Sequence, residues 1–418
     1  MPDGPLIRHL KSQRRLWFQV HLWLGLSLGV ILSVIGLTGS VLVFWMEIDE
    51  FLHPDLIRVA APENAGYRSL EEIAAAARAA IPPGATLYEL NWPRHRNAAV
   101  ICGFGVPNPA ARGEPDSWDI FIDPYTARVT GKRLWYSAEN WWKNAFLGIL
   151  FKIHYALMIR RWGTVLVGSM TFLFLLMTFT GLYVWWPLSG KWRQALTMAW
   201  PASGTRLNFE LHKAGGFYSL LVLAAVLITG IYLDLSEQVV WVLKRVSSVE
   251  RPGIPQRTVA ARLPLTLDEG VAAAQKAFPD SKPYSLQWAR DAKSIALEQL
   301  VPYGLGFASR RIVVVDLTTS AIRHVADPVH ATFGTAYIQW QWPLHSGRVW
   351  GMTGRILVFL SGLVCPLLLV TGFNRWYWKG RANQRQRGCD NLPQYTATRN
   401  KVKWFSRPPG APGSGTHS

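Results

Sequence analysis

Apolar residues in this chain gather in four long blocks instead of recurring with the short period of a surface helix. The blocks cover approximately residues 17–46, 164–186, 211–233 and 354–374. Each is close to the roughly 20 residues that an α-helix needs to cross the hydrocarbon core of a bilayer. The first block is too long for a signal-peptide core, and no small-residue cleavage site follows it. The pattern therefore predicts four membrane-spanning helices, the first of them an uncleaved anchor.

Two long polar segments separate these blocks and show a different pattern. Residues 67–92 and 265–288 each contain an Ala-rich amphipathic stretch with acids in its first turn. Residues 117–131 and 309–325 alternate apolar and polar positions and include a turn with Asp, as antiparallel strands do. The predicted fold is therefore a membrane α plus α+β protein, in which a four-transmembrane-helix bundle carries two α+β domains.

The apolar helices of the two halves repeat at a constant spacing of 191 residues. The first and third helices begin at His21 and His212, and the second and fourth at His154 and His345. All four end in Thr-Gly, at Thr38-Gly39, Thr180-Gly181, Thr229-Gly230 and Thr371-Gly372. Two independent helix pairs with one gap-free spacing predict an internal duplication. The Thr-Gly pairs are expected to let neighbouring helices approach closely.

The distribution of charge predicts how the bundle is oriented. The chain has 44 lysines and arginines against 26 acids, a net charge of +18. The segments before the first block, between the second and third, and after the fourth carry 16 cations against two acids, whereas 22 of the 26 acids fall in 47–142 and 235–343. By the positive-inside rule, both termini and the middle loop are expected in the cytoplasm of a bacterium and the two α+β domains in its periplasm. The high charge therefore needs no nucleic-acid partner to explain it.

These assignments give expected boundaries for each part of the chain. They are a cytoplasmic N-terminus at 1–16, a helix at 17–46, a periplasmic domain at 47–142, an outer histidine-bearing segment with the second helix at 143–186, a cytoplasmic loop at 187–208, the third helix at 209–234, a second periplasmic domain at 235–342, the fourth helix at 343–376 and a basic, partly disordered cytoplasmic tail at 377–418.

Cys102, Cys365 and Cys389 fall in three different compartments, so no disulfide framework is expected.

The four helix histidines sort into two levels in this topology. His21 and His212 open helices on the cytoplasmic side, whereas His154 and His345 precede helices on the outer side. A four-helix bundle brings such residues together across its core. A single histidine at a helix end is more often an interfacial residue than a ligand, but matched spacing favours ligands. Because two neutral imidazoles suit a low-spin haem iron, we predict two bis-histidine b-type haems, an inner one on His21 and His212 and an outer one on His154 and His345.

The outer pair raises a question of depth. The 27 residues from His154 to Gly181 would span about 40 Å as one helix, more than the ~30 Å hydrocarbon core. The outer pair therefore lies at or above the headgroups, or the helices break near Gly163 and Gly354.

Several polar residues near the outer pair are further candidates for the site. Arg160, Arg161 and Arg348 are candidate partners of haem propionates, although snorkelling toward lipid phosphates explains each of them at least as well. His324 and His330 are candidates for substrate contact, with solvated loop positions as the simpler interpretation.

Parts of the sequence resemble a known family. RRLWFQVHLWLGLSLGVILSVIGLTGSVLVFW, TFTGLYVWWPLSGKW and WPLHSGRVWG with the later LLLVTG resemble the PepSY-associated transmembrane helix family, and IFIDPYTARVTG and IVVVDLTTSAIRHV resemble PepSY domains. The resemblance covers approximately residues 12–380. Members similar to this four-helix form include inner-membrane ferric-siderophore reductases of the FoxB type, which implies two b-type haems on His21, His212, His154 and His345. One departure is Cys365-Pro366 inside the fourth helix, where a kink is expected.

The predicted function is therefore transmembrane electron transfer by a dihaem enzyme that reduces a periplasmic ferric siderophore and releases Fe(II). No G-x-G-x-x-G motif follows a strand, so a cytoplasmic protein or a quinol has to supply the electrons. The competing hypothesis is a non-enzymatic PepSY-type membrane protein that binds a periplasmic peptide, peptidase or cell-wall partner, with structural histidines. The colour of the purified protein separates the two hypotheses.

Overall fold

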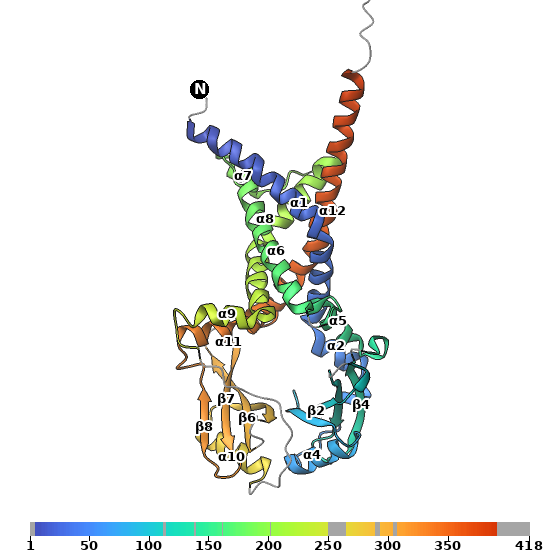
Figure 1. Ribbon diagram of the computed structural model, residues 1–418, viewed down its shortest axis with the longest axis vertical. Helices are drawn as coiled ribbons and strands as arrows, with labels where there is room; N and C mark the ends of the chain where they lie inside the picture. The colour runs from blue at the N-terminus through green and yellow to red at the C-terminus, as the bar shows by residue number, and fades with distance from the viewer. Residues whose placement is uncertain are drawn as a thin grey trace, which may run out of the picture. The chain divides into compact units, whose positions relative to one another are not determined.

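The computed structural model describes residues 5–111, 114–137, 139–160, 162–200, 202–249, 265–288, 293–303 and 307–390. The chain divides into two compact units, Met1–Asn374 and Arg375–Ser418. The first unit combines long apolar helices with an antiparallel sheet, as the sequence predicts (Figure 1).

Four helices among the described residues are long and apolar enough to cross a membrane. They are α1 (Pro5–Leu42), α6 (Gly163–Trp185), α8 (Gly204–Asp234) and α12 (Gly351–Asp390). Leu32, Phe174, Leu223, Leu227 and Cys365 form a buried apolar cluster where the four helices meet. At the expected kink, α12 continues through Pro366 as one helix.

Short helices precede two of the spanning helices, and a sharp turn of the chain separates each short helix from the spanning helix that follows. In the first half, α5 (Phe146–Ala156) ends at Leu157 and Met158, whose φ angles of 49° and 59° are left-handed, and α6 begins at Gly163. In the second half, α11 (Phe333–His345) and η3 (Arg348–Trp350) precede α12. A Cβ added to Gly163 or Gly354 would collide with backbone carbonyls across the break. The break expected near these two glycines is therefore present.

The strands of both halves form one eight-stranded antiparallel sheet. They are β1 (Thr86–Asn91), β2 (Val100–Val106), β3 (Asp116–Ile122), β4 (Val129–Tyr136), β5 (Lys282–Trp288), β6 (Ser294–Tyr303), β7 (Phe307–Asp316) and β8 (Ile322–Ala326), in the order β4-β3-β2-β1-β5-β6-β7-β8. The two α+β domains expected from the sequence thus share a sheet. They join where Leu90 of β1 pairs with Leu286 of β5.

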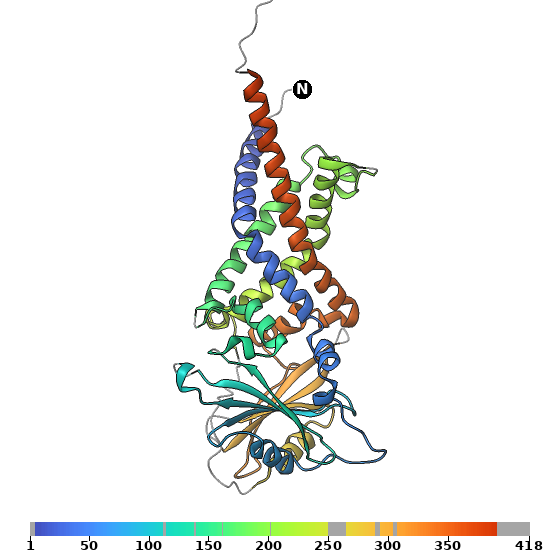
Figure 2. The ribbon, with the colours of Figure 1, turned by 90° about the vertical axis from the view of Figure 1, so that its right-hand side faces the viewer.

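Two amphipathic helices, α4 (Leu70–Ala79) and α10 (Leu267–Ala277), pack side by side on one face of this sheet (Figure 2). Each helix is capped by an acid of the other half. Asp268 accepts a hydrogen bond of 2.8 Å from the Leu70 N–H, and Glu71 accepts one from the Leu267 N–H. Since the first N–H groups of a helix lack partners within it, this exchange ties the two halves together.

The remaining short elements connect these parts. They are α2 (Trp45–Leu52), α3 (Pro54–Ile57), η1 (Pro109–Ala111), η2 (Trp141–Lys143), α7 (Trp192–Leu196) and α9 (Ser236–Leu243).

Candidate haem-binding histidine pairs

The structure brings the four helix histidines together in two pairs. His21 of α1 faces His212 of α8, with ring centroids 6.4 Å apart and ring planes at 83°. His154 of α5 faces His345 of α11, with centroids 6.1 Å apart and planes at 61°. These are the same pairs that the repeat in the sequence predicts.

The spacing within each pair fits one iron between two imidazoles. Metal–nitrogen bonds of about 2 Å on both sides of an ion would place the ring centroids roughly 6.3 Å apart. The described residues contain no group of three or more His, Cys, Asp or Glu side chains that could hold a metal. A bis-histidine haem needs only two protein ligands, since the porphyrin supplies the other four nitrogens. The pairs therefore suit haem better than a bare metal ion.

The Nδ1 atom of each histidine is held by a neighbouring helix. A threonine hydroxyl lies near Nδ1 of all four: Thr180 at 3.2 Å from His21, Thr38 at 3.3 Å from His154, Thr229 at 3.0 Å from His345 and Thr371 at 2.8 Å from His212. In three of them a backbone carbonyl also lies near Nδ1: Met177 at 3.1 Å from His21, Ile35 at 2.9 Å from His154 and Val226 at 3.1 Å from His345. Because a carbonyl only accepts, Nδ1 carries the proton in His21, His154 and His345. Their Nε2 atoms are then the unprotonated nitrogens that can bind a metal.

The glycine of each Thr-Gly pair lies against the edge of the same imidazole. A Cβ added at the glycine would lie 2.7 Å from Cε1 for Gly39 and His154, 3.0 Å for Gly181 and His21, 3.3 Å for Gly372 and His212, and 3.4 Å for Gly230 and His345. Besides any role in close helix approach, the Thr-Gly motif docks a histidine of a neighbouring helix: its hydroxyl holds Nδ1, and its glycine makes room for the ring.

The two halves build these contacts in the same way. The His21–Thr180 and His212–Thr371 contacts both join residues 159 apart in sequence. The His154–Thr38 and His345–Thr229 contacts both join residues 116 apart. Sequence reasoning missed the threonines as site residues, although their recurrence at all four helices was the signal that pointed to them.

Glycines also keep side chains off the helix faces beside one pair. Gly25 and Gly216 each follow a histidine of the His21–His212 pair by four residues, one helical turn, and so lie on the same helix face. A Cβ added at Gly25 would lie 3.8 Å from its nearest described neighbour, the Met177 sulfur. At Gly216 the nearest is Leu368, also at 3.8 Å. An added Cβ would therefore meet no tight contact at either position.

The histidines of the other pair are held in the neutral form. His154 and His345 belong to α5 and α11, which lie outside the four spanning segments. Burial lowers the pKa of His154, and burial together with the neighbouring His154 lowers the pKa of His345 to about 4. Neutral imidazole is the form that binds metals, so this pair is ready to act as a ligand pair at neutral pH.

The candidate cations differ in their surroundings. Arg348, three residues after His345, is half-buried, and within the described part of the chain its guanidinium lies 3.4 Å from the Met46 sulfur. Arg160 forms an ion pair of 3.6 Å with Glu114, and Arg161 lies outside the described residues. The thioether of Met46 carries no charge, so an anionic partner would form a stronger, charge-assisted hydrogen bond with the Arg348 guanidinium. Arg348 is therefore a better candidate for a propionate than Arg160, which already pairs with Glu114.

The two histidines proposed for substrate contact lie on the sheet. His324 belongs to β8, at one edge of the sheet, and His330 lies in the exposed turn after that strand. The structure therefore places His324 on the edge strand and His330 in the short turn between β8 and α11, the helix that carries His345.

Together, the spanning helices and the antiparallel sheet define a multi-pass membrane protein with α+β parts. The profile of the family described as the PepSY-associated TM region matches residues 18–379, and the chain belongs to this family. A comparison with curated proteins finds no match.

The glycine contacts give a graded prediction within the His154–His345 pair. Gly39→Ala is expected to displace His154, because the new Cβ would lie 2.7 Å from its ring, whereas the corresponding 3.4 Å at Gly230 is ordinary contact for Gly230→Ala. Losing the support of a metal ligand typically costs 10–100-fold in affinity, so haem affinity at this pair should fall by about that factor in Gly39→Ala. Haem titration of both variants measures the effect. Equal losses in the two variants would contradict the proposed docking role.

Proposed function

We propose that this protein is a dihaem transmembrane electron-transfer enzyme that reduces a ferric siderophore outside the membrane and releases Fe(II) for iron uptake. One observation carries the proposal: two histidine pairs lie 6.4 and 6.1 Å apart between ring centroids, and neighbouring helices hold their Nδ1 atoms. Bound haem would supply one-electron chemistry at two levels of the bundle.

The residues of the chain determine what kind of haem chemistry fits. If each pair supplied both protein ligands of a haem, His21 with His212 and His154 with His345 would leave no open position for oxygen, which would favour electron transfer over oxygen binding. The threonine hydroxyls and carbonyls that accept from Nδ1–H raise ligand basicity and fix ring orientation. Arg348 would pair with a propionate at the His154–His345 level.

The overall reaction transfers one electron to each Fe(III). Fe(III) prefers hard oxygen ligands more strongly than Fe(II) does, so reduction loosens the chelate and releases the metal. The sequence has no dinucleotide-binding motif, so the electron comes from a cytoplasmic protein or a quinol.

The charge pattern supports a location in a bacterial inner membrane. The cation-rich segments fit cytoplasmic termini and a cytoplasmic middle loop, which puts the sheet in the periplasm. In this orientation the His21–His212 pair is nearer the electron donor, and the His154–His345 pair is nearer the siderophore.

The spectrum of the purified protein tests the proposal. Two b-type haems per chain are expected from a pyridine haemochrome assay, with a Soret band and α and β bands that sharpen on reduction by dithionite. Anaerobic addition of a ferric siderophore should reoxidise the reduced haems, and a ferrous chelator should capture the Fe(II) formed. A folded, colourless preparation would instead favour the non-enzymatic hypothesis of a peptide-, peptidase- or cell-wall-binding protein.

A further inference from the structure

Two short helices follow the spanning segments at the end of the bundle where His154 and His345 lie. Two residues separate α2 (Trp45–Leu52) from the end of α1 at Leu42, and one residue separates α9 (Ser236–Leu243) from the end of α8 at Asp234. The two helices occupy equivalent positions in the repeat, 191 residues apart. So short a connection spans at most about 10 Å, which keeps both helices close to the membrane surface.

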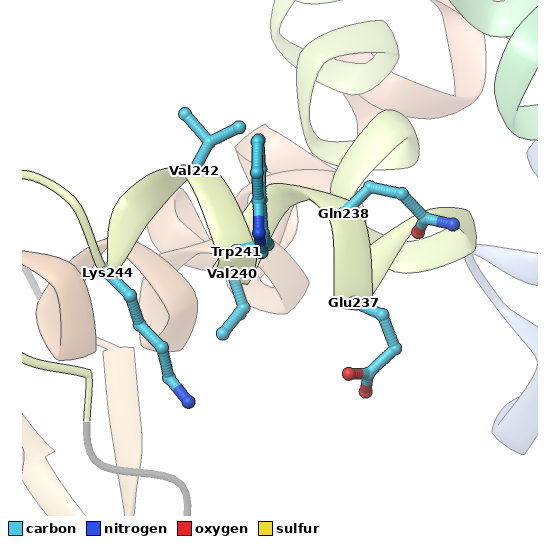
Figure 3. Close-up of a pocket in the computed structure, with 6 residues that line it drawn as sticks. All are labelled: Glu237, Gln238, Val240, Trp241, Val242 and Lys244. Atoms are coloured by element: carbon cyan, nitrogen blue, oxygen red, sulfur yellow. The ribbon is translucent and has the colours of Figure 1, made fainter.

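The helix α9 has an apolar side that the described protein leaves uncovered. Val240 and Leu243 are buried, but Trp241 is 59% exposed and Val242 is 55% exposed. In Figure 3, Trp241 and Val242 project to one side of α9, and Glu237 and Lys244 project to the other. Trp241 and Val242 are therefore apolar side chains that the described protein leaves uncovered.

A hollow on the surface of α9 adds to this pattern. Six residues line it, namely Glu237, Gln238, Val240, Trp241, Val242 and Lys244 (Figure 3). Next to it, the Arg245 guanidinium lies over the Trp241 ring, 3.4 Å from its centroid. Tryptophan and arginine at the edge of an apolar surface are typical of the lipid headgroup region.

The equivalent position in α2 is exposed in the same way. Phe51, which corresponds to Val242 in the repeat, is 81% exposed, and Leu52 beside it is 46% exposed. Full burial of one such side chain is worth about 1.5–3 kcal/mol. The recurrence of an uncovered apolar residue at one repeat position indicates a common partner for both helices.

The helix α2 and the residues that follow α9 also contact the elements that carry the nearby histidine pair. Trp45 of α2 packs edge-to-face on Phe151 of α5, with ring centroids 5.7 Å apart. After α9, the Ser248 carbonyl accepts a hydrogen bond of 2.6 Å from the Thr332 hydroxyl, and Ser247 Oγ accepts one of 2.9 Å from the Gly334 N–H at the start of α11. The position of α2 and α9 therefore bears on His154 and His345.

We infer that α2 and α9 are interfacial helices that lie in the headgroup region of a phospholipid bilayer, with Phe51, Trp241 and Val242 among the upper acyl chains. Their direct continuity with the spanning helices favours lipid over a protein partner, since the membrane surface is already within reach. This anchoring fixes the His154–His345 pair near the membrane surface. The inference does not depend on haem binding or on reductase activity.

Spin-label accessibility in phospholipid nanodiscs tests this placement. Phe51→Cys and Val242→Cys would be labelled with a nitroxide in a Cys389→Ser background, in which Cys102 and Cys365 are buried and unreactive. Glu237→Cys and Lys244→Cys, on the other side of α9, are the matched controls. Labels at positions 51 and 242 are expected to collide more with oxygen, which concentrates in the bilayer, than with a water-soluble nickel chelate. The two control labels should show the opposite preference.

Two outcomes would overturn the inference. Greater accessibility to the nickel chelate at positions 51 and 242 would place them in water. A second outcome is that both labels are protected from both reagents and show spin–spin broadening. If that broadening disappears when labelled protein is diluted with unlabelled protein before reconstitution, a second copy of the chain covers this surface. Circular dichroism of each variant confirms that the fold is retained.

Discussion

His21→Ala and His212→Ala are each expected to lose one haem, the same one, and to retain the other. The two rings lie with centroids 6.4 Å apart, so removing either would leave a bound haem with one protein ligand. His154→Ala and His345→Ala are expected to lose the second haem together, for the same reason. The measurement is haem content per chain, followed by a redox titration that assigns the remaining haem from its midpoint potential.

The pairing makes this experiment sharper than a test for haem alone. The haem that remains in His21→Ala and in His212→Ala should have the same midpoint potential. The haem that remains in His154→Ala and in His345→Ala should have the other midpoint potential. His330→Ala is a suitable control, because His330 is exposed and follows β8. Loss of different haems from His21→Ala and His212→Ala would refute the pairing even if the protein binds two haems.

The histidine pairs were predictable because they depend on spacing along helices. A constant offset of 191 residues places His21 and His212, or His154 and His345, at equivalent points of two equivalent helices. A bundle core then brings equivalent points together. The pairing of the histidines follows from regular helices and does not depend on the conformation of the loops.

The threonine contacts depend on which helices are neighbours, and spacing does not reveal that. Thr180 of α6 holds His21, whereas Thr38 of α1 holds His154. Each threonine therefore serves a histidine of a different helix, 159 or 116 residues away. The motif was visible in the sequence, but its partner depends on how the helices pack.

The joined sheet was beyond sequence reasoning for a similar reason. Alternating residues predict strands but leave open which edges pair, and β1 carries little to distinguish an edge strand from a central one. In the structure Leu90 and Leu286 pair at the centre of the joined sheet. The short helices α2 and α9 fall largely within the two predicted α+β domains, and eight residues are too few for a distinctive periodicity.

Removal of the His154–His345 pair is expected to block reduction of an external ferric siderophore by a donor enclosed in proteoliposomes. From His21 to Thr38, which contacts His154, α1 rises about 25 Å. The apolar cluster of Leu32, Phe174 and Leu223 fills the bundle core. Without the second pair, an electron that reaches the first has no redox centre on the siderophore side. In His345→Ala the external rate should therefore fall by more than about 100-fold, the upper limit for loss of a residue that only supports a metal ligand. The enclosed donor should still reduce the remaining haem at the wild-type rate, which shows that the donor side is intact. Wild-type external reduction by His345→Ala, with one haem confirmed missing, would show that the pair is not on the route to the siderophore.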